Sequence, residues 1–175
     1  MPQVAVQKVF VDSSDIKIIS GFSEQDYEDA LVLFYHNWDN TRKRLLSFSN
    51  SAPAFFIDGE GMKPWNPINN KSRWMIENYR GALDMAGEWF LDRSGYLYYM
   101  PLPGETILNT VFYAPILKEF ISIKGDSPDK TVSNIRFENL SFAVSGYRTP
   151  AAGNEPAQAA APVGAVITID YAENI

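Results

Sequence analysis

The 175-residue chain contains no cysteine and a single histidine, His36. Without cysteine it can form no disulfide bridge, no cysteine-ligated zinc site and no thiol nucleophile, although the redox compartment stays open. One histidine excludes sites that need two, and a serine–histidine–aspartate triad would depend on His36 alone. Glycine-rich phosphate loops and EF-hand spacings are also missing. We therefore expect no cofactor and no metal.

Basic residues and long apolar runs are scarce too. The chain has 15 Lys and Arg against 21 Asp and Glu, a net charge of −6, and its longest basic run is the triplet at residues 42–44. A nucleic-acid partner needs a basic footprint, so we expect none. No stretch approaches the roughly 18 apolar residues that span a bilayer, and Met1-Pro2-Gln3 does not open like a secretory signal. We expect no membrane span and see no signal peptide.

What the chain has in quantity is apolar and aromatic character in short segments. Hydrophobic residues make up 46% and aromatic residues 14%, a globular balance. Short alternating segments separated by Pro and Gly predict an all-β protein. The expected strands are 4–11, 15–20, 31–38, 41–49, 54–57, 88–91, 96–100, 110–113, 120–123, 134–142 and 166–175.

Three local signals interrupt these strands. Ser23 and Asp26 occupy the positions of a capping box, which predicts a helix of one or two turns over 23–30. Residues 72–85 mix both periodicities and predict a strand that enters a short helix. Gly95 can supply the positive φ of a tight turn, so 88–100 predicts a β-hairpin, whereas 61–70 is rich in Pro, Gly and Asn and predicts an exposed loop.

The last third of the chain has a different pattern. In 134–142 the alternation changes phase at Asn139, and 166–175 repeats this with Asn174. A strand, a one-residue corner and a second strand is typical of one rung of a parallel β-helix. Residues 143–164 between these rungs form a long loop rich in Ala, Pro and Gly, which indicates either a functional loop or a disordered one.

Several motifs in this order resemble bacterial right-handed parallel β-helix glycoside hydrolases, including xylosidase-like and fucosidase-like members. They are 35–38 (YHNW) with 41–42, 77–84 (ENYRGALD), 87–92 (GEWFLD, with Phe90 for the family's Tyr), 95–99 (GYLYY), 114–117 (APIL), 134–142 and 158–160 (QAA). The resemblance implies an all-β fold: a β-sandwich-like inserted domain with short strands, plus the first rungs of a right-handed parallel β-helix. Residues 1–30 would be N-terminal strands at a β-helix edge, 31–125 the inserted domain and 126–175 the rungs.

The resemblance also implies a role. In this family the catalytic acids lie on rungs after the QAA segment, so the chain would be an internal, non-catalytic fragment of an extracellular or periplasmic glycoside hydrolase acting on plant or host polysaccharide. Asp84, Glu88 and Asp92 are expected to be turn and cap residues. The alternative is a carbohydrate-binding or structural module of a β-helix surface protein without enzyme activity. A polysaccharide lyase relative would need a basic residue and usually a calcium site, and we identify neither. The partner would be an oligo- or polysaccharide, and an open β-helix end could template self-association.

No catalytic residue is predicted, but six residues are candidates for substrate contact: Trp65, His36, Trp38, Arg42, Tyr147 and Gln158. Trp65, set among prolines, is the best candidate for stacking on a sugar. Core packing is the alternative for Trp38, Trp74 and Trp89, and a structural ion pair with Asp39 or Glu88 is the alternative for Arg42. Tyr147 and Gln158 lie on the long loop, where they can line a cleft or be solvated.

Overall fold

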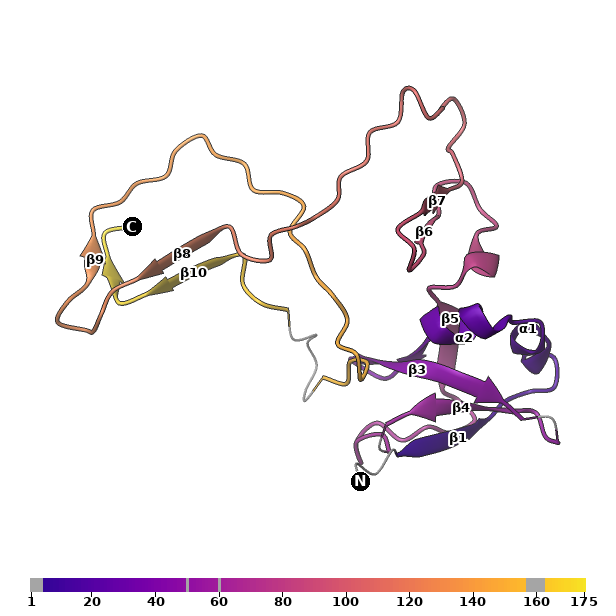
Figure 1. Ribbon diagram of the computed structural model, residues 1–175. Coiled ribbons are helices and arrows are strands. Elements are labelled where there is room, and N and C mark those ends of the chain that lie inside the picture. The colour runs from indigo at the N-terminus through magenta and orange to yellow at the C-terminus, as the bar shows by residue number, and fades with distance from the viewer. Residues whose placement is uncertain (1–4, 50, 60, 157–162) are drawn as a thin grey trace. The chain divides into compact units, whose positions relative to one another are not determined.

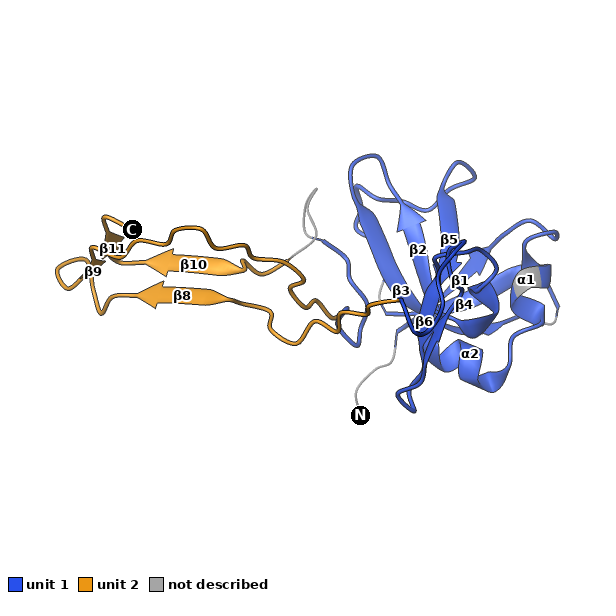
Figure 2. Cartoon of the chain, turned by 90° about the horizontal axis from the view of Figure 1, so that it is seen from above, with its two compact units in different colours: residues 1–109, 149–161 blue, residues 110–148, 162–175 orange. Residues whose placement is uncertain are grey.

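The chain divides into two compact units, each of which is described by itself. The computed structural model describes residues 5–49, 51–59, 61–156 and 163–175 (Figure 1). Unit 1 comprises Met1–Asn109 and Thr149–Ala161, and unit 2 comprises Thr110–Arg148 and Pro162–Ile175 (Figure 2). Strands predominate in both, which confirms the all-β class.

Unit 1 is built on an open five-stranded sheet with the order β1-β4-β3-β2-β5, in which every neighbouring pair is antiparallel. Its strands coincide with predicted ones: β1 (Val6–Phe10), β2 (Leu31–Tyr35), β3 (Asn40–Phe48), β4 (Ala54–Asp58) and β5 (Arg73–Glu77). The strands β1 and β5 are the two edges. A turn at residues 36–39 joins β2 to β3, so the two form a hairpin.

Two short helices, α1 (Ile16–Ser20) and α2 (Glu24–Asp29), follow β1. The capping box of α2 is confirmed: the Ser23 hydroxyl accepts from Asp26 N, and Ser23 N donates to the Asp26 carboxylate at 2.8 Å. The strand predicted over 15–20 is wrong, because this segment is α1. Ile16 and Ile19 are three residues apart, which suits one face of a helix, and Ile19 is fully buried.

The core of unit 1 lies against one face of the sheet. Alternate residues point to this face, so Val32 and Phe34 from β2 meet Phe55 and Ile57 from β4. Phe55 is fully buried, with its ring centroid 6.4 Å from that of Phe34 and 5.0 Å from that of Trp74. The buried cluster consists of Val9, Ile19, Ala30, Val32, Phe34, Leu45, Phe55 and Ile57.

The segment after β5 follows the prediction. A single 3-10 turn, η1 (Arg80–Ala82), comes after the strand, and β6 (Trp89–Leu91) pairs with β7 (Leu97–Tyr99) as the expected hairpin. Gly95 in its turn has φ +90°. Arg93 in the same turn donates to the buried Asp29 carboxylate at 2.5 Å, which ties the hairpin to the end of α2.

Unit 2 consists of two parallel strand pairs: β8 (Ile121–Lys124) with β10 (Ile167–Asp170), and β9 (Val132–Ser133) with β11 (Ala172–Glu173). Asn139 and Asn174, the predicted corners, have φ of 56° and 55°. Because Glu173 is opposite Ser133, Asn174 is level with Asn134, which also has positive φ, and not with Asn139.

Two further predicted strands are wrong, since the structure has no strand at 110–113 or at 134–142. A strand needs a neighbour for its backbone groups, and alternation alone does not supply one. Ile135, Phe137, Leu140 and Phe142 are all exposed. The long loop is partly fixed, because Asn154 and Arg42 exchange backbone hydrogen bonds of 2.7 and 2.8 Å. The predicted domain boundaries stay predictions.

The aromatic contacts of Phe55 yield a stability prediction. We expect Phe55→Ala to lower the free energy of unfolding by about 3 to 5 kcal/mol, because it empties the centre of the core. Phe10→Ala, on the same sheet but 69% exposed, should change it by less than about 0.5 kcal/mol. Urea unfolding followed by tryptophan fluorescence measures both, and equal effects would contradict the assignment of the core.

Candidate functional site

The turn between β2 and β3 carries two of the predicted site residues. His36 N donates to Asp39 O at 3.0 Å and closes the turn. The ring of His36 is half-buried, with Nε2 2.9 Å from Oγ1 of the fully buried Thr41. Between them Trp38 is 59% exposed. Core packing is therefore the wrong reading of Trp38, because a four-residue turn at the end of a hairpin extends past the core.

A second loop is drawn to this turn by one side chain. Asn66 is 3% exposed, and its Nδ2 lies 2.9 Å from both carboxylate oxygens of Asp39. Trp65 is 50% exposed, as expected for this polar loop. Trp38 immediately precedes Asp39, and Trp65 immediately precedes Asn66. Two exposed indoles thus emerge from two segments that a single amide–carboxylate contact holds together.

Arg42 has a structural partner that the sequence did not indicate. Its Nε donates to Glu77 Oε1 at 2.7 Å and its Nη1 to Asn40 Oδ1 at 3.0 Å. The expected partners Asp39 and Glu88 are not used in these bonds. Neighbouring residues of a strand point to opposite faces. Arg42 therefore lies on the face of β3 opposite Thr41 and its partner His36, so the two predicted residues do not act side by side.

The base of the loop at 61–70 is fixed by a buried ion pair. Lys43, only 6% exposed, donates through Nζ to Glu155 Oε2 at 3.2 Å. The other oxygen of Glu155 accepts from Lys63 N at 2.9 Å. Gly153 makes this docking possible, because its φ is +81° and a Cβ there would lie 2.1 Å from Arg42 O. Residues 149–156 thus fasten both β3 and the loop that presents Trp65.

The remaining predicted residues lie elsewhere. Tyr147 is 47% exposed and belongs to unit 2. Gln158 lies outside the described residues. In unit 1, Trp38 and Trp65 are each next in sequence to one partner of the Asp39–Asn66 contact, and Arg42 lies on the face of β3 opposite Thr41 and His36.

The hairpin after η1 carries two further exposed aromatic side chains, Trp89 and Tyr96. Trp89 is 66% exposed, although core packing was the expectation for it. In a three-residue strand the middle residue faces one way and its neighbours the other, and here Phe90 is the buried one. Tyr96 is also exposed. The alternation in β6 indicated that Trp89 and Phe90 point to opposite faces, but it could not indicate which of the two faces is covered.

The acids of this hairpin serve its turns, as expected. Glu88 Oε2 accepts from the backbone N–H groups of Asp84 and Met85 at 2.9 and 3.0 Å. The pKa of the Asp92 carboxyl lies below its usual 3.8, chiefly because it accepts a hydrogen bond from the Ser94 hydroxyl and further ones from backbone N–H groups. A carboxylate held in its anionic form by a turn is suited to capping and not to donating a proton.

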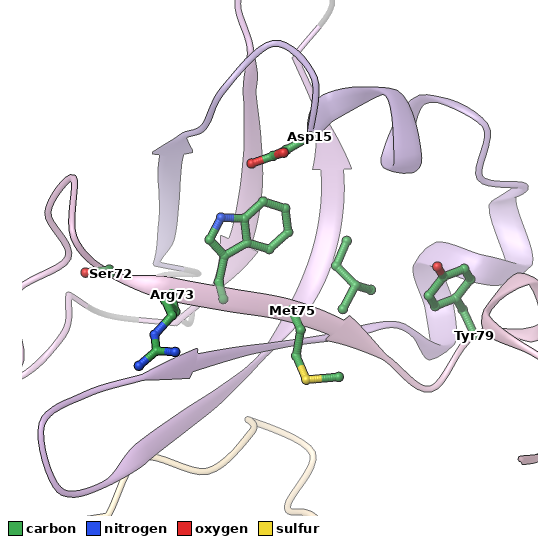
Figure 3. A pocket seen from close by; sticks show the side chains of 7 residues that line it. Asp15, Ser72, Arg73, Met75 and Tyr79 are labelled. Atoms are coloured by element: carbon green, nitrogen blue, oxygen red, sulfur yellow. The ribbon is translucent and has the colours of Figure 1, made fainter. Parts of the chain in front are cut away.

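Two shallow hollows border the sheet of unit 1. One, of about 520 Å³, runs beside the edge strand β5, with Arg73 and Met75 on one side of the strand and Asp15 on the other (Figure 3). The second, of about 570 Å³, borders β1 and the 62–70 loop. Neither is lined by a predicted site residue. Among the described residues, no cluster of three His, Asp or Glu side chains could hold a metal, and no helix could cross a membrane.

Comparison with known proteins finds one kind of similarity. No family model matches the chain, and no curated protein matches it. Among solved structures, a chain titled "Glycoside hydrolase" is similar, with a TM-score of 0.63 and 23% sequence identity. The match covers 80% of this chain but only 26% of the other. It shows that this chain shares the fold of about a quarter of a glycoside hydrolase.

The buried ion pair makes a prediction about the loop. Glu155→Gln should lower the free energy of unfolding by about 3 to 5 kcal/mol, because it leaves the Lys43 ammonium buried without a counter-charge. The double variant Lys43→Met with Glu155→Leu should lose clearly less, since neither charge remains. Chemical denaturation of the parent, Lys43→Met, Glu155→Leu and the double variant gives the coupling energy between the two side chains. Additive losses would mean that the two side chains do not interact.

Proposed function

We propose that this chain is a non-catalytic, saccharide-contacting part of a carbohydrate-active protein. The observation that carries the proposal is the pair of exposed tryptophans, Trp38 and Trp65, on loops joined by Asp39 and Asn66. An exposed indole offers a flat apolar face to the C–H face of a sugar ring. The shared fold with part of a glycoside hydrolase supports a saccharide as the partner.

In this proposal unit 1 is a β-sandwich-like inserted domain, and unit 2 supplies rungs of a right-handed parallel β-helix. The parallel pairs β8–β10 and β9–β11 and the left-handed corners at Asn134, Asn139 and Asn174 support the second part. The parent protein would be a bacterial glycoside hydrolase that acts on plant or host polysaccharide outside the cytoplasm. Tyr147 remains a candidate contact within unit 2.

A second reading is a carbohydrate-binding or structural module without enzyme activity. The hydrogen bonds of Glu88 and Asp92, the acids on the hairpin that carries Trp89, favour this alternative. Both carboxylates accept hydrogen bonds from backbone N–H groups of their own turns. Glycoside hydrolysis usually needs one carboxyl group that donates a proton and a second that acts as base or nucleophile. Saccharide binding is common to the proposed function and to the carbohydrate-binding form of this alternative.

Binding can be tested residue by residue. We expect Trp65→Ala and Trp38→Ala each to weaken binding to any responsive glycan by roughly tenfold or more, because each removes a stacking face. Trp89→Ala is the matched control, since Trp89 is equally exposed but lies on the hairpin and should leave affinity within about twofold. A glycan array identifies the ligand and calorimetry measures the affinities. Equal losses in all three variants, or no binding to any saccharide, would count against the proposed surface.

The absence of catalysis is a separate expectation. The chain should release no product above background from aryl glycosides or from the glycans that it binds, because no proton donor and nucleophile pair is assigned to it. A sensitive fluorogenic assay run beside a buffer blank measures this. Turnover that disappears in Asp84→Asn or Asp170→Asn would overturn the non-catalytic assignment while leaving the binding surface in place.

A further inference from the structure

The edge strand β5 is open to another strand. It is the last strand of the sheet, so one of its two rows of backbone N–H and C=O groups faces no strand of this sheet. The hollow of about 520 Å³ lies directly beside it (Figure 3). Met75 at its centre is 43% exposed. Exposed strand edges of this kind are templates for pairing with another chain.

The sequence of β5 is complementary to itself. Arg73, Met75 and Glu77 point to the same face, opposite the core, because alternate residues of a strand share a face. Arg73 and Glu77 stand two residues to either side of Met75. If two copies of this strand lie antiparallel and centred on Met75, each Arg73 is opposite a Glu77 of the other copy. The two methionines then meet at the centre.

We propose that unit 1 self-associates through β5, so that two five-stranded sheets join into one continuous sheet across a two-fold axis. Opposite charges directly across an antiparallel pair are favourable, and a two-fold interface requires this kind of self-complementarity. The proposal concerns the sheet edge of unit 1 and does not depend on saccharide binding or on an open β-helix end.

The two charged side chains of β5 can make these pairs, while the Met75 sulfur accepts a hydrogen bond from the Tyr35 hydroxyl at 3.2 Å. Arg73 is exposed, and within the described residues it has no ion-pair partner. Glu77 uses Oε1 to bind Arg42, and its side chain remains 29% exposed. A carboxylate has about four acceptor positions, so Glu77 can accept a second arginine without releasing the first. Arg42 then holds Glu77 in place for the other copy.

The opposite edge of the sheet lacks this property. In β1 the central residue is Lys8, so two copies centred in the same way would place Lys8 against Lys8. Like charges directly opposite each other are destabilising. Pairing of two copies in this way would therefore be electrostatically repulsive at β1 and attractive at β5. The strand β5 is the edge that selects a second copy.

Charge reversal tests the pairing. We expect Arg73→Glu and Glu77→Arg each to raise the dissociation constant of the dimer roughly tenfold or more, because each places like charges across both ends. An equimolar mixture of the two variants should restore dimers, since each acidic edge then meets a basic one. Lys71→Glu, the same charge change two residues before the strand, is the matched control. Sedimentation equilibrium measures the parent, the three variants and the mixture, with circular dichroism to confirm folding.

A cross-link tests the register without altering charge. The chain has no cysteine, so in Met75→Cys a disulfide can form only between two copies. Opposite Cα atoms in an antiparallel pair are about 4.5 to 5.5 Å apart, within the range that a disulfide spans. Met75→Cys should therefore become a covalent dimer under mild oxidation, whereas Leu91→Cys on the exposed side of β6 should stay monomeric.

Each outcome decides the proposal. Restored dimers in the mixture, or selective cross-linking at position 75, would support pairing through β5. A strictly monomeric parent at all concentrations would overturn it. Dimers that survive Arg73→Glu while Met75→Cys does not cross-link would also overturn it, and they would indicate association elsewhere, such as through unit 2.

Discussion

The alternation of side chains across the β3 strand is the constraint on which the rest of unit 1 depends. The residues of β3 that point inward are Thr41, Lys43 and Leu45, and all three are buried. Leu45 joins the apolar cluster, whereas Thr41 and Lys43 are polar and must find partners at the same depth. Thr41 meets His36, and Lys43 meets Glu155. Thr41 and Lys43, the polar inward residues of β3, thus fix the turn that presents Trp38 and the loop that presents Trp65.

This arrangement explains why the long loop returns to unit 1. The strand β4 pairs with β3 only from Leu45 onward, and the register shifts between Leu45 and Ser47. The earlier part of that edge of β3 is left for another segment. Asn154 pairs there with Arg42, and Glu155 reaches Lys43 beside it. A loop rich in Ala, Pro and Gly can pack so closely because Gly153 has no side chain to meet the backbone of Arg42.

Local patterns predicted the elements whose stability is local. The capping box at Ser23, the hairpin around Gly95 and the β2–β3 hairpin each depend on residues close in sequence, and all three were predictable. The segment at 15–20 was not, because its isoleucines fit a period of two and a period of three, and only packing of Ile19 into the core decides between them. The segment at 134–142 failed for another reason: its alternation is strict, but a strand exists only where a neighbour accepts its backbone bonds.

The candidate site was predictable by residue type but not by arrangement. An exposed Trp65 followed from its polar loop, and the exposure of Trp38 follows from a turn whose length only the structure defines. The contact between Asp39 and Asn66 spans 27 residues, so no local pattern reveals it. Arg42 shows the same limit. Its partner Glu77 is on β5 and not on β2, so the pairing requires knowledge that β2 lies between β3 and β5 in the sheet.

The two units use backbone pairing in opposite ways, and this difference bears on how each can meet a partner. The sheet of unit 1 is antiparallel, and its exposed edges are the strands at its two ends, β1 and β5. Unit 2 is parallel: β8 pairs with a strand 46 residues later, Ile121 being level with Ile167. A parallel ladder grows by stacking, so in the proposed β-helix an edge of unit 2 would present the register of the whole rung, including the corners at Asn134 and Asn174. An antiparallel edge can pair with a short, charge-matched strand, as proposed for β5, whereas such a rung edge would require a partner that matches both its strands and its corners.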